Sequence, residues 1–417
     1  MTDLSGKTII ITAGRPKEVL DGVRHYANHS RPEDHGLRVA EELTAQGAKV
    51  IIISPNGRKI VTAEDMMAAF KEEVERSNPD IALQLASVSS IRPASVSEHK
   101  LKVKSVAGAA VTLDVVGNID VPARMKALLP GKPIAGYDNY QQWFSEGDAP
   151  AIALIREIAE RALVGKTPAE ATQGSGKILL GGKLSGKKII ITSGPTAETL
   201  TETGDVITNF SSGKQGLAIA ESLRKMGADV IYVTGPTKLA DPDLGIVTLH
   251  VKNAVAMRDA CVKHLRADAF IGVAAVADFG VVSPLAIRLS ESEAFTLQLQ
   301  QNPDILQTMG THPTQRPTAV IGFAAETKDL ILYATGKLEK KGADGICANE
   351  VGGAMIKRGS DRNKIQFVTR DGIEDWPELG KDEVGEYIGE RIARILLRQG
   401  QIQPHQLRNE GGVNQVG

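Results

Sequence analysis

The sequence is poor in cysteine, has almost no net charge and lacks a long apolar run, and each absence narrows the class of protein. It contains two cysteines, Cys261 and Cys347, in apolar surroundings, which predicts buried thiols rather than a disulfide framework or metal site. A net charge of -1 over 417 residues gives no support for nucleic acid or an anionic membrane as partner. The longest apolar run, "FIGVAAVADFGVV", is interrupted by Asp278 and is too short to cross a bilayer. The first residues, "MTDLSGKTIIIT", lack the basic and apolar regions of a targeting segment, so a cytoplasmic protein is expected.

What the sequence does contain is an internal repeat, in which segments of the first half recur in the same order in the second. The four pairs are "SGKTIIITAG" (Ser5–Gly14) with "SGKKIIITSG" (Ser185–Gly194), "HGLRVAEELTAQGAKVIIIS" (His35–Ser54) with "QGLAIAESLRKMGADVIYVT" (Gln215–Thr234), "VTLDVVGNID" (Val111–Asp120) with "FTLQLQQNPD" (Phe295–Asp304), and, more loosely, "KPIAGYDNY" (Lys132–Tyr140) with "RPTAVIGFAAET" (Arg316–Thr327). An ordered series of this kind predicts a duplicated chain.

Each copy follows a β-α-β pattern. Short β-branched runs that end at glycine are typical of buried parallel strands, and the apolar residues that follow have helical spacing. The predicted fold class is therefore α/β, with two Rossmann-like doubly wound parallel-sheet domains related by duplication. The later elements expected in the second copy are helices at Val255–Leu265, Lys328–Lys341 and Val384–Leu397 and strands at Ala269–Val276 and Gly345–Ala348. The expected boundaries are 1–165 and 187–400 for the domains, 166–186 for a Gly-rich linker and 401–417 for a disordered tail.

Four segments of the second copy carry candidate binding residues. "NFSSGKQG" (Asn209–Gly216) precedes an amphipathic helix and fits either a phosphate-binding loop or a capped loop-to-helix junction. "GVAAVADF" and "IGFAAETKD" bring Asp278, Phe323 and Glu326 to the ends of strands, where an acid binds a ligand or caps a turn. Lys337 and Lys341 lie one helical turn apart and could grip a triphosphate or form a solvated face.

The first copy offers different polar residues. Lys100, Lys102 and Lys104 alternate, so in an extended segment they would point the same way, either toward an anion or as protection of an edge strand. His25, His29 and His35 lie close in sequence, but their spacing fits no standard zinc template.

The motifs "ITSGPT", "NFSSGKQG", "AAVADF", "NPDIL", "GFAAET" and "KLEKKGADGICAN" occur in the order seen in the phosphopantothenoylcysteine synthetase family, which the chain resembles from Ser185 to about Leu397. The resemblance implies a phosphopantothenate–cysteine ligase of coenzyme A biosynthesis. In this family CTP or ATP, with Mg²⁺, activates the carboxylate of 4'-phosphopantothenate, and cysteine attacks the acyl-nucleotide; no flavin is required.

The family's site residues map onto the second copy. Asn209 matches the asparagine associated with the acyl-nucleotide intermediate, and the other positions are nucleotide contacts. These contacts are Ser211, Ser212, Gly213, Gly272, Val273, Ala274, Asp278, Pro303, Asp304, Ile305, Leu306, Phe323, Lys337 and Lys341.

Two departures from the family are mirrored in the first copy. The family's flap lysine aligns with Ala286, and its arginine before the asparagine aligns with Asp205. The first copy keeps Arg24, Asn28 and Lys100 in the corresponding places.

The first copy instead lacks the residues that match the family's nucleotide contacts. Ser90 replaces the strand-end aspartate, and Glu33 and Asp34 in "SRPEDHG" would repel a triphosphate. The complementary losses predict a fused, monomeric pseudo-dimer with one composite active site, to which the first copy supplies Arg24, Asn28 and Lys100.

Two alternatives stay open: a related ligase that activates a different carboxylate, and a non-catalytic nucleotide-binding protein derived from a synthetase. The sequence does not decide between CTP and ATP.

Overall fold

The computed structural model describes residues 4–55, 60–97, 111–138, 142–147, 149–163, 182–242, 245–286, 293–326, 329–350 and 362–400. The chain forms two compact units. Unit 1 comprises Met1–Ala169 together with Glu198–Thr208 and Phe279–Gln300, and unit 2 comprises the remainder. Two segments of the second sequence repeat therefore belong to unit 1, which the repeat boundaries did not predict.

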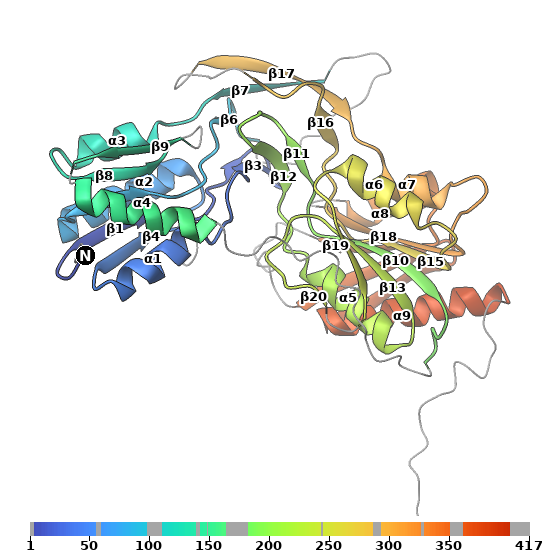
Figure 1. Cartoon of the computed structure of the whole chain (residues 1–417). Coiled ribbons are helices and arrows are strands. Elements are labelled where there is room, and N and C mark those ends of the chain that lie inside the picture. Colours follow the sequence, from blue (N-terminus) through green and yellow to red (C-terminus); the bar gives the residue numbers. More distant parts are fainter. Residues whose placement is uncertain are drawn as a thin grey trace, which may run out of the picture. The chain divides into compact units, whose positions relative to one another are not determined.

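Unit 1 contains a doubly wound sheet with the strand order β4-β1-β5-β8-β9 (Figure 1). The first four strands are parallel and the last is antiparallel. The strands are β1 (Thr8–Thr12), β4 (Lys49–Ile53), β5 (Ile81–Gln84), β8 (Ile134–Tyr137) and β9 (Trp143–Glu146). The helices are α1 (His35–Ala45), α2 (Ala63–Ser77), α3 (Val121–Leu128) and α4 (Ala149–Leu163).

The side chains of β1 point alternately to the two faces of the sheet, and a layer of helices covers each face. Ile9 and Ile11 belong to the core that includes residues of α1 and α4, whereas Ile10 belongs to the core that includes α2 and α3. Successive side chains of a strand point to opposite faces, so a continuous apolar run is what a sheet covered on both sides requires.

Unit 1 also contains two smaller sheets that combine strands of both repeats. Their orders are β11-β12-β3-β2 and β16-β17-β7-β6. The strands are β2 (Glu18–Val19), β3 (Arg24–Asn28), β6 (Ile91–Pro93), β7 (Val111–Gly117), β11 (Ala197–Thr199), β12 (Asp205–Asn209), β16 (Phe279–Val281) and β17 (Ala294–Gln301). β7 and β17 pair antiparallel, with Leu113 opposite Leu297. Apolar residues of both sheets, including Tyr26, Val115, Ile207 and Leu297, form one core.

Unit 2 is built on an eight-stranded sheet of order β14-β13-β10-β15-β18-β19-β20-β21. Its strands are β10 (Lys188–Ser193), β13 (Asp229–Thr234), β14 (Val247–His250), β15 (Ala269–Gly272), β18 (Ala319–Glu326), β19 (Gly345–Glu350), β20 (Arg362–Thr369) and β21 (Gly372–Gly380). The strands from β14 to β19 are parallel, and β20 and β21 are antiparallel.

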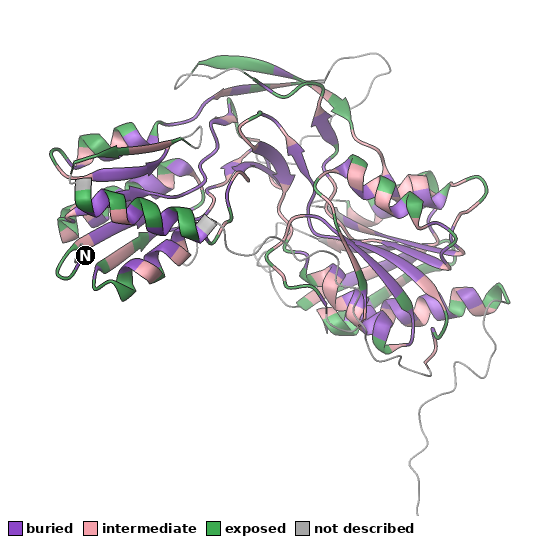
Figure 2. Ribbon diagram, viewed as in Figure 1, coloured by how far each residue is buried: buried purple, intermediate pink, exposed green. Residues whose placement is uncertain are grey.

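Helices cover both faces of this sheet, and its central strands are buried (Figure 2). The helices are α5 (Lys214–Lys225), α6 (Ala254–Lys263), α7 (Ile305–Gly310), α8 (Leu330–Lys341) and α9 (Lys381–Arg398). Ile189 and Ile191 of β10 pack in the core with α5 and α9, and Ile190 packs in the core with α6, α7 and α8. The predicted mixed α/β architecture with parallel sheets is thus confirmed. No helix in the described part of the chain is long and apolar enough to cross a membrane.

Candidate functional site

The candidate site lies at the carboxyl edge of the unit 2 sheet, where β10 and β15 end side by side. Thr192 of β10 is in register with Gly272 of β15, and the chain leaves β10 toward β13 on one side while β15 lies on the other. This is the topological switch point, which is where open α/β sheets bind ligands. The fold therefore places the predicted "GVAAVADF" segment at the expected edge.

The loop before α5 presents backbone N–H groups at this edge. Gly213 has a φ of +75°, and a Cβ there would lie 2.8 Å from Cγ2 of Thr237, so glycine is required. No side chain within the described ranges caps α5. Ser211 and Ser212 accept from the N–H groups of Gly213 and Lys214 only at 3.4 Å, beyond the usual hydrogen-bond range. An uncapped helix N-terminus with weakly used donors suits a phosphate.

Asn209 ends β12 just before this loop. Its Nδ2 donates to the carbonyl of Ala275 at 2.9 Å, which ties the loop to the segment that follows β15. Its Oδ1 is buried and has no hydrogen-bond partner in the described part of the chain. Buried acceptors are normally satisfied, so this oxygen is suited to accept from a bound molecule.

The residues after β15 approach β10 and α7 closely. Val273 and Ala274 donate backbone N–H groups to the carbonyl and hydroxyl of Thr192, each at 3.3 Å. A Cβ on Gly322 would lie 2.4 Å from Cδ2 of Leu306, and one on Gly272 would lie 3.6 Å from its Cδ1. Gly322 thus makes room for Leu306 of α7, which also lies in contact range of Gly272.

Asp278 and Pro303 are brought together by Asn302. The backbone N–H of Asn302 donates to the Asp278 carbonyl at 2.9 Å, and its Nδ2 donates to the Ala277 carbonyl at 2.9 Å. The Asp278 side chain is exposed. Asn302 is therefore a positioning residue that was not singled out from the sequence, although it is the first letter of "NPDIL".

The predicted lysines of α8 both reach residues of the predicted set. Lys337 Nζ donates to the Phe323 carbonyl at 3.2 Å, and Lys341 Nζ pairs with Asp304. Asp304 also caps α7, accepting from the Gln307 N–H at 2.9 Å. The carboxylate neutralises Lys341 while no nucleotide is bound, so a triphosphate would have to compete for the ammonium group.

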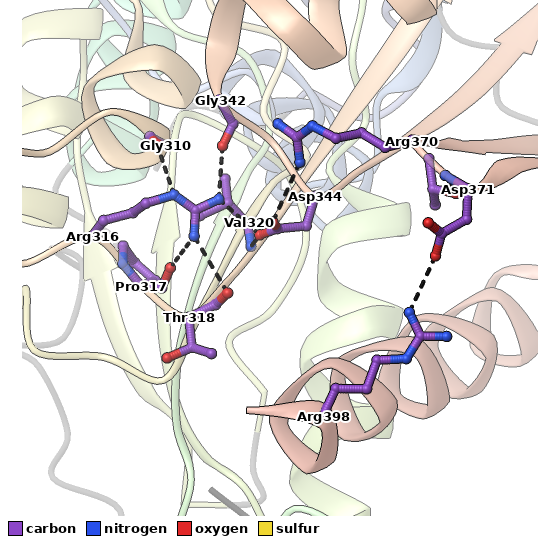
Figure 3. Close-up of polar contacts among 11 residues, drawn as sticks. Gly310, Arg316, Pro317, Thr318, Val320, Gly342, Asp344, Arg370, Asp371 and Arg398 are labelled. Atoms are coloured by element: carbon purple, nitrogen blue, oxygen red, sulfur yellow. Dashed lines mark hydrogen bonds and ion pairs between the residues drawn. The ribbon is translucent and has the colours of Figure 1, made fainter. Parts of the chain in front are cut away.

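Arg316 joins the ends of the two helices that carry these residues (Figure 3). Its guanidinium donates to the carbonyls of Gly310 and Gly342, both at 2.8 Å, and to Asp344 at 2.9 Å. It also donates to the carbonyls of Pro317 and Thr318. These bonds satisfy carbonyls that the ends of α7 and α8 leave unpaired, and they fix α7 relative to α8. Sequence inspection gave no signal for this role.

Two predicted site residues of unit 1 are enclosed: Asn28, the counterpart of Asn209, and Arg24, the arginine that the second copy lacks. Asn28 is 1% exposed; its Nδ2 donates to Asp205 at 2.8 Å, and its Oδ1 accepts from the Ser30 N–H at 3.0 Å. Arg24 is buried and pairs with Asp21 through Nε at 2.9 Å and Nη2 at 2.6 Å. Lys100, Lys102 and Lys104 lie outside the described residues.

Asp205 is the centre of this unit 1 network. It is fully buried and accepts from Asn28, from the hydroxyl and N–H of Ser90, and from the Thr201 hydroxyl at 2.9 Å. Burial raises the pKa of the Asp205 carboxyl, and these hydrogen bonds oppose that shift. The charge reversal seen in the sequence is thus accommodated by a polar network, and Ser90, the counterpart of Asp278, is part of it.

Cys261 and Cys347 are buried and not disulfide-bonded, as predicted. Burial raises the pKa of Cys261 to about 12 and raises that of Cys347 as well, so neither thiol is a nucleophile at neutral pH. No group of three or more His, Cys, Asp or Glu side chains that could hold a metal occurs among the described residues.

Comparison with known proteins identifies the family. Residues 4–137 and 184–396 match the family described as DNA/pantothenate metabolism flavoprotein C-terminal domain, and the chain belongs to it. This agrees with the resemblance inferred from the ordered motifs.

The chain is similar to the protein named coenzyme A biosynthesis bifunctional protein CoaBC from several bacteria. It is 38% identical to that of Vibrio cholerae over 203 residues, which cover 48% of this chain and 50% of the relative. It is 38% identical to that of Haemophilus influenzae over 220 residues, covering 51% and 54%. The chain thus spans about half the length of the curated relatives it matches. A crystal structure of the C-terminal domain of a CoaBC protein aligns with 52% of this chain and 98% of that domain, at 37% identity and a TM-score of 0.44.

Proposed function

We propose that the protein is a ligase of coenzyme A biosynthesis that joins 4'-phosphopantothenate and L-cysteine, with CTP or ATP as co-substrate. The observation that carries the proposal is the Asn209 amide oxygen, which is buried and has no hydrogen-bond partner among the described residues. It lies just before the N-terminus of α5, which no side chain of those residues caps. The names of the bacterial relatives support the same pathway.

The reaction has two substitutions. An oxygen of the substrate carboxylate attacks the α-phosphorus of the nucleotide, the bond from that phosphorus to the bridging oxygen breaks, and pyrophosphate leaves. The cysteine amine then attacks the acyl carbon, the amide bond forms, the amine loses a proton, and the nucleoside monophosphate leaves with its electron pair. Both steps need positioning and charge neutralisation more than a protein nucleophile.

The residues of unit 2 are assigned to these needs. Ser211, Ser212, Gly213 and the N-terminus of α5 would hold phosphate oxygens, and Lys337 and Lys341 would neutralise charge on the leaving pyrophosphate. Asn209 Oδ1 would accept a hydrogen bond from the acyl-nucleotide. Mg²⁺ would enter with the nucleotide phosphates as part of the co-substrate.

The remaining predicted contacts complete the nucleotide site. Gly272–Ala274, Asp278, Pro303, Ile305, Leu306 and Phe323 would surround the base and ribose, with Asp278 as an exposed acceptor.

We also propose that the two repeats form a fused pseudo-dimer. Leu113 and Leu297 occupy the same place in the two copies and lie opposite each other in β7 and β17, as residues on the axis of an isologous dimer do. The complementary losses in the sequence support a single composite active site, to which the first repeat would contribute Lys100. Arg24 and Asn28, which the same losses named, are buried in hydrogen-bond networks of unit 1, and we assign them to positioning.

The function is tested by supplying the full chain with 4'-phosphopantothenate, cysteine and either CTP or ATP. Pyrophosphate release should require the nucleotide and phosphopantothenate, and amide formation should in addition require cysteine. Release with another acid alone would favour the different-carboxylate ligase. Nucleotide binding without release for any acid would favour the non-catalytic binding protein.

Lys100→Ala addresses the composite site in the same assay. Full turnover by this variant would exclude a contribution of Lys100.

A further inference from the structure

A polar cluster surrounds the ring of Tyr137, the last residue of β8, at the carboxyl edge of the unit 1 sheet. The Arg31 guanidinium lies over the ring, 4.4 Å from its centroid. The ring of His35, the first residue of α1, is 5.8 Å away edge-on, and the ring of Trp143 is 5.2 Å away. Arg31 Nη2 donates at 2.8 Å to the carbonyl of Ala86, just after β5. The cluster therefore lies where open parallel sheets bind ligands.

The Arg31 side chain is buried with unfilled hydrogen-bonding capacity. Arg31 is 5% exposed, and its Nε and Nη1 have no hydrogen-bond partner in the part of the chain that the structure describes. No carboxylate of the described residues forms an ion pair with it. Buried guanidinium groups are normally paired, because an unpaired buried charge is costly.

The other polar groups of the cluster show the same deficit. His35 Nε2 lies 2.9 Å from the Ala159 carbonyl, to which it must donate, so the lone pair of the neutral ring is on Nδ1. That Nδ1 is buried and has no hydrogen-bond partner among the residues that the structure describes. Burial lowers the pKa of His35 and keeps the ring neutral, and burial lowers the pKa of Arg31 to about 10, which leaves it charged.

Three acids lie near the cluster, and none of them forms an ion pair with Arg31 in the described part of the chain. The charge of Asp138, next to Tyr137, favours the charged form of Arg31. Glu33 lies 4.0 Å from Arg15, and Asp34 lies 3.3 Å from Arg38, so each of these two acids has an arginine of its own. Arg15 donates to the Arg31 carbonyl and has a buried, unpartnered Nε. The repulsion of a bound anion that is expected from Glu33 and Asp34 is therefore reduced.

We propose that unit 1 binds a phosphate group at Arg31, in a site distinct from the nucleotide site proposed in unit 2. Phosphate matches both deficits: its anionic oxygens accept from the Arg31 fork, and its hydrogen-bearing oxygen donates to His35 Nδ1. A carboxylate at neutral pH offers only acceptors and would leave His35 unpartnered. The phosphate is either free, in which case it keeps a hydrogen-bearing oxygen at neutral pH, or esterified to a small metabolite, in which case it binds as the monoanion because the second pKa of a monoester is about 6.

Trp143 provides a local reporter, because the chain contains only two tryptophans. The other, Trp376, is buried against Phe367 in unit 2. Trp376→Phe leaves the fluorescence of Trp143, which lies in the cluster. In this background the full chain is titrated at constant ionic strength with inorganic phosphate, with AMP as an esterified phosphate, and with acetate.

Phosphate or AMP should change the Trp143 fluorescence saturably, and acetate should not. A response to phosphate alone identifies the free anion as ligand, and a tighter response to AMP identifies the esterified group. Arg31→Gln should weaken binding roughly tenfold or more, since it removes a charged hydrogen-bond donor. The matched control is Arg124→Gln, which removes one solvent-accessible charge of the same unit, and it should bind within about twofold of the parent.

The proposal is overturned if neither phosphate nor AMP gives a saturable change, or if Arg31→Gln titrates like the parent. If Arg31→Gln does not fold, as judged by circular dichroism, Arg31→Lys decides. Lysine keeps the positive charge but lacks the paired N–H donors of the guanidinium, so phosphate binding should be weakened. Unchanged binding would contradict the proposal.

Discussion

The two aligned asparagines, Asn28 and Asn209, occupy opposite kinds of environment. Asn28 is enclosed, and both ends of its amide are used within unit 1, by Asp205 and Ser30. Asn209 is only half-buried, and its Oδ1 has no partner in the described residues. A saturated amide stabilises the fold, whereas an amide with a vacant acceptor can bind substrate. The difference favours chemistry at the second copy.

The two sheet edges differ in the same sense. In unit 2, the helix after the asparagine begins at Lys214, and no side chain in the described part of the chain caps it. Lys337 and Lys341 lie among the predicted contacts. In unit 1, the corresponding loop carries Arg31, which lies on Tyr137, the counterpart of Phe323. We propose that the first edge binds a triphosphate and that the second keeps a smaller positive centre.

The largest expected effect is on kcat, when Asn209 and Asn28 are each replaced by alanine in separate variants. Asn209→Ala should lower kcat on the order of 100-fold or more, as the loss of a preorganised group at a reacting centre does. Asn28→Ala should leave kcat within a few-fold and instead lower the thermal midpoint of unit 1, because Asp205 loses a buried donor. Steady-state kinetics and calorimetry on both variants measure the two effects.

Asn28→Ser is a more conservative variant at the same position, because serine retains a polar group. A kcat loss as large for Asn28→Ala as for Asn209→Ala would break the comparison and support a catalytic role for both residues, as predicted from the sequence.

A smaller effect is expected from the lysines of α8. Lys341→Ala should raise the nucleotide KM roughly tenfold, because a charge-assisted contact to phosphate is lost. Lys340→Ala, an exposed neighbour on the same helix, removes the same charge and should change KM less than twofold. Equal KM values for the two variants would mean that Lys341 serves only its ion pair with Asp304.

Some elements could be predicted closely from the sequence. β1 (Thr8–Thr12) coincides with the β-branched run of "SGKTIIITAG", because such a run ended by glycine satisfies both local propensity and burial on two faces. α9 begins at Lys381, earlier than the expected Val384, because Glu383 accepts from the Gly380 N–H. The predicted strand at Ala269–Val276 stops at Gly272, because Ala274 donates to the Thr192 hydroxyl and pairing beyond it is limited to an isolated bridge between Ala275 and Pro195.

Other features depend on partners far away in the sequence. The environment of Asn28 is set by Asp205, 177 positions later, and the sequence alone showed Asp205 only as a charge reversal. The pairing of β7 with β17 joins the two repeats within unit 1, and local patterns carry no register between distant strands. The residues of the candidate site could therefore be found by their motifs, but which amide is saturated could not.

The smallest effect, and the one that isolates unit 1, concerns the pH dependence of stability at Asp205. Because burial raises the pKa of this carboxyl, the folded state holds its proton more tightly than the unfolded chain, in which the pKa is about 3.9. The stability that the protonated form contributes is therefore present below that value and is lost as pH rises toward the folded pKa, with a slope of at most about 1.4 kcal/mol per pH unit.

Asp205→Asn should remove this dependence while keeping the network. The new Oδ1 can still accept from Asn28, and the new amide N–H groups can donate to the hydroxyls of Ser90 and Thr201, which rotate to accept. In scanning calorimetry of the full chain, the midpoint of the variant should rise relative to the parent between pH 4 and pH 7. Asp371→Asn, at an exposed position, should follow the parent throughout. Parallel curves of midpoint against pH for the parent and Asp205→Asn would show that folding does not shift the pKa of Asp205. The contrast between Asn28 and Asn209 would then rest on their hydrogen bonds alone.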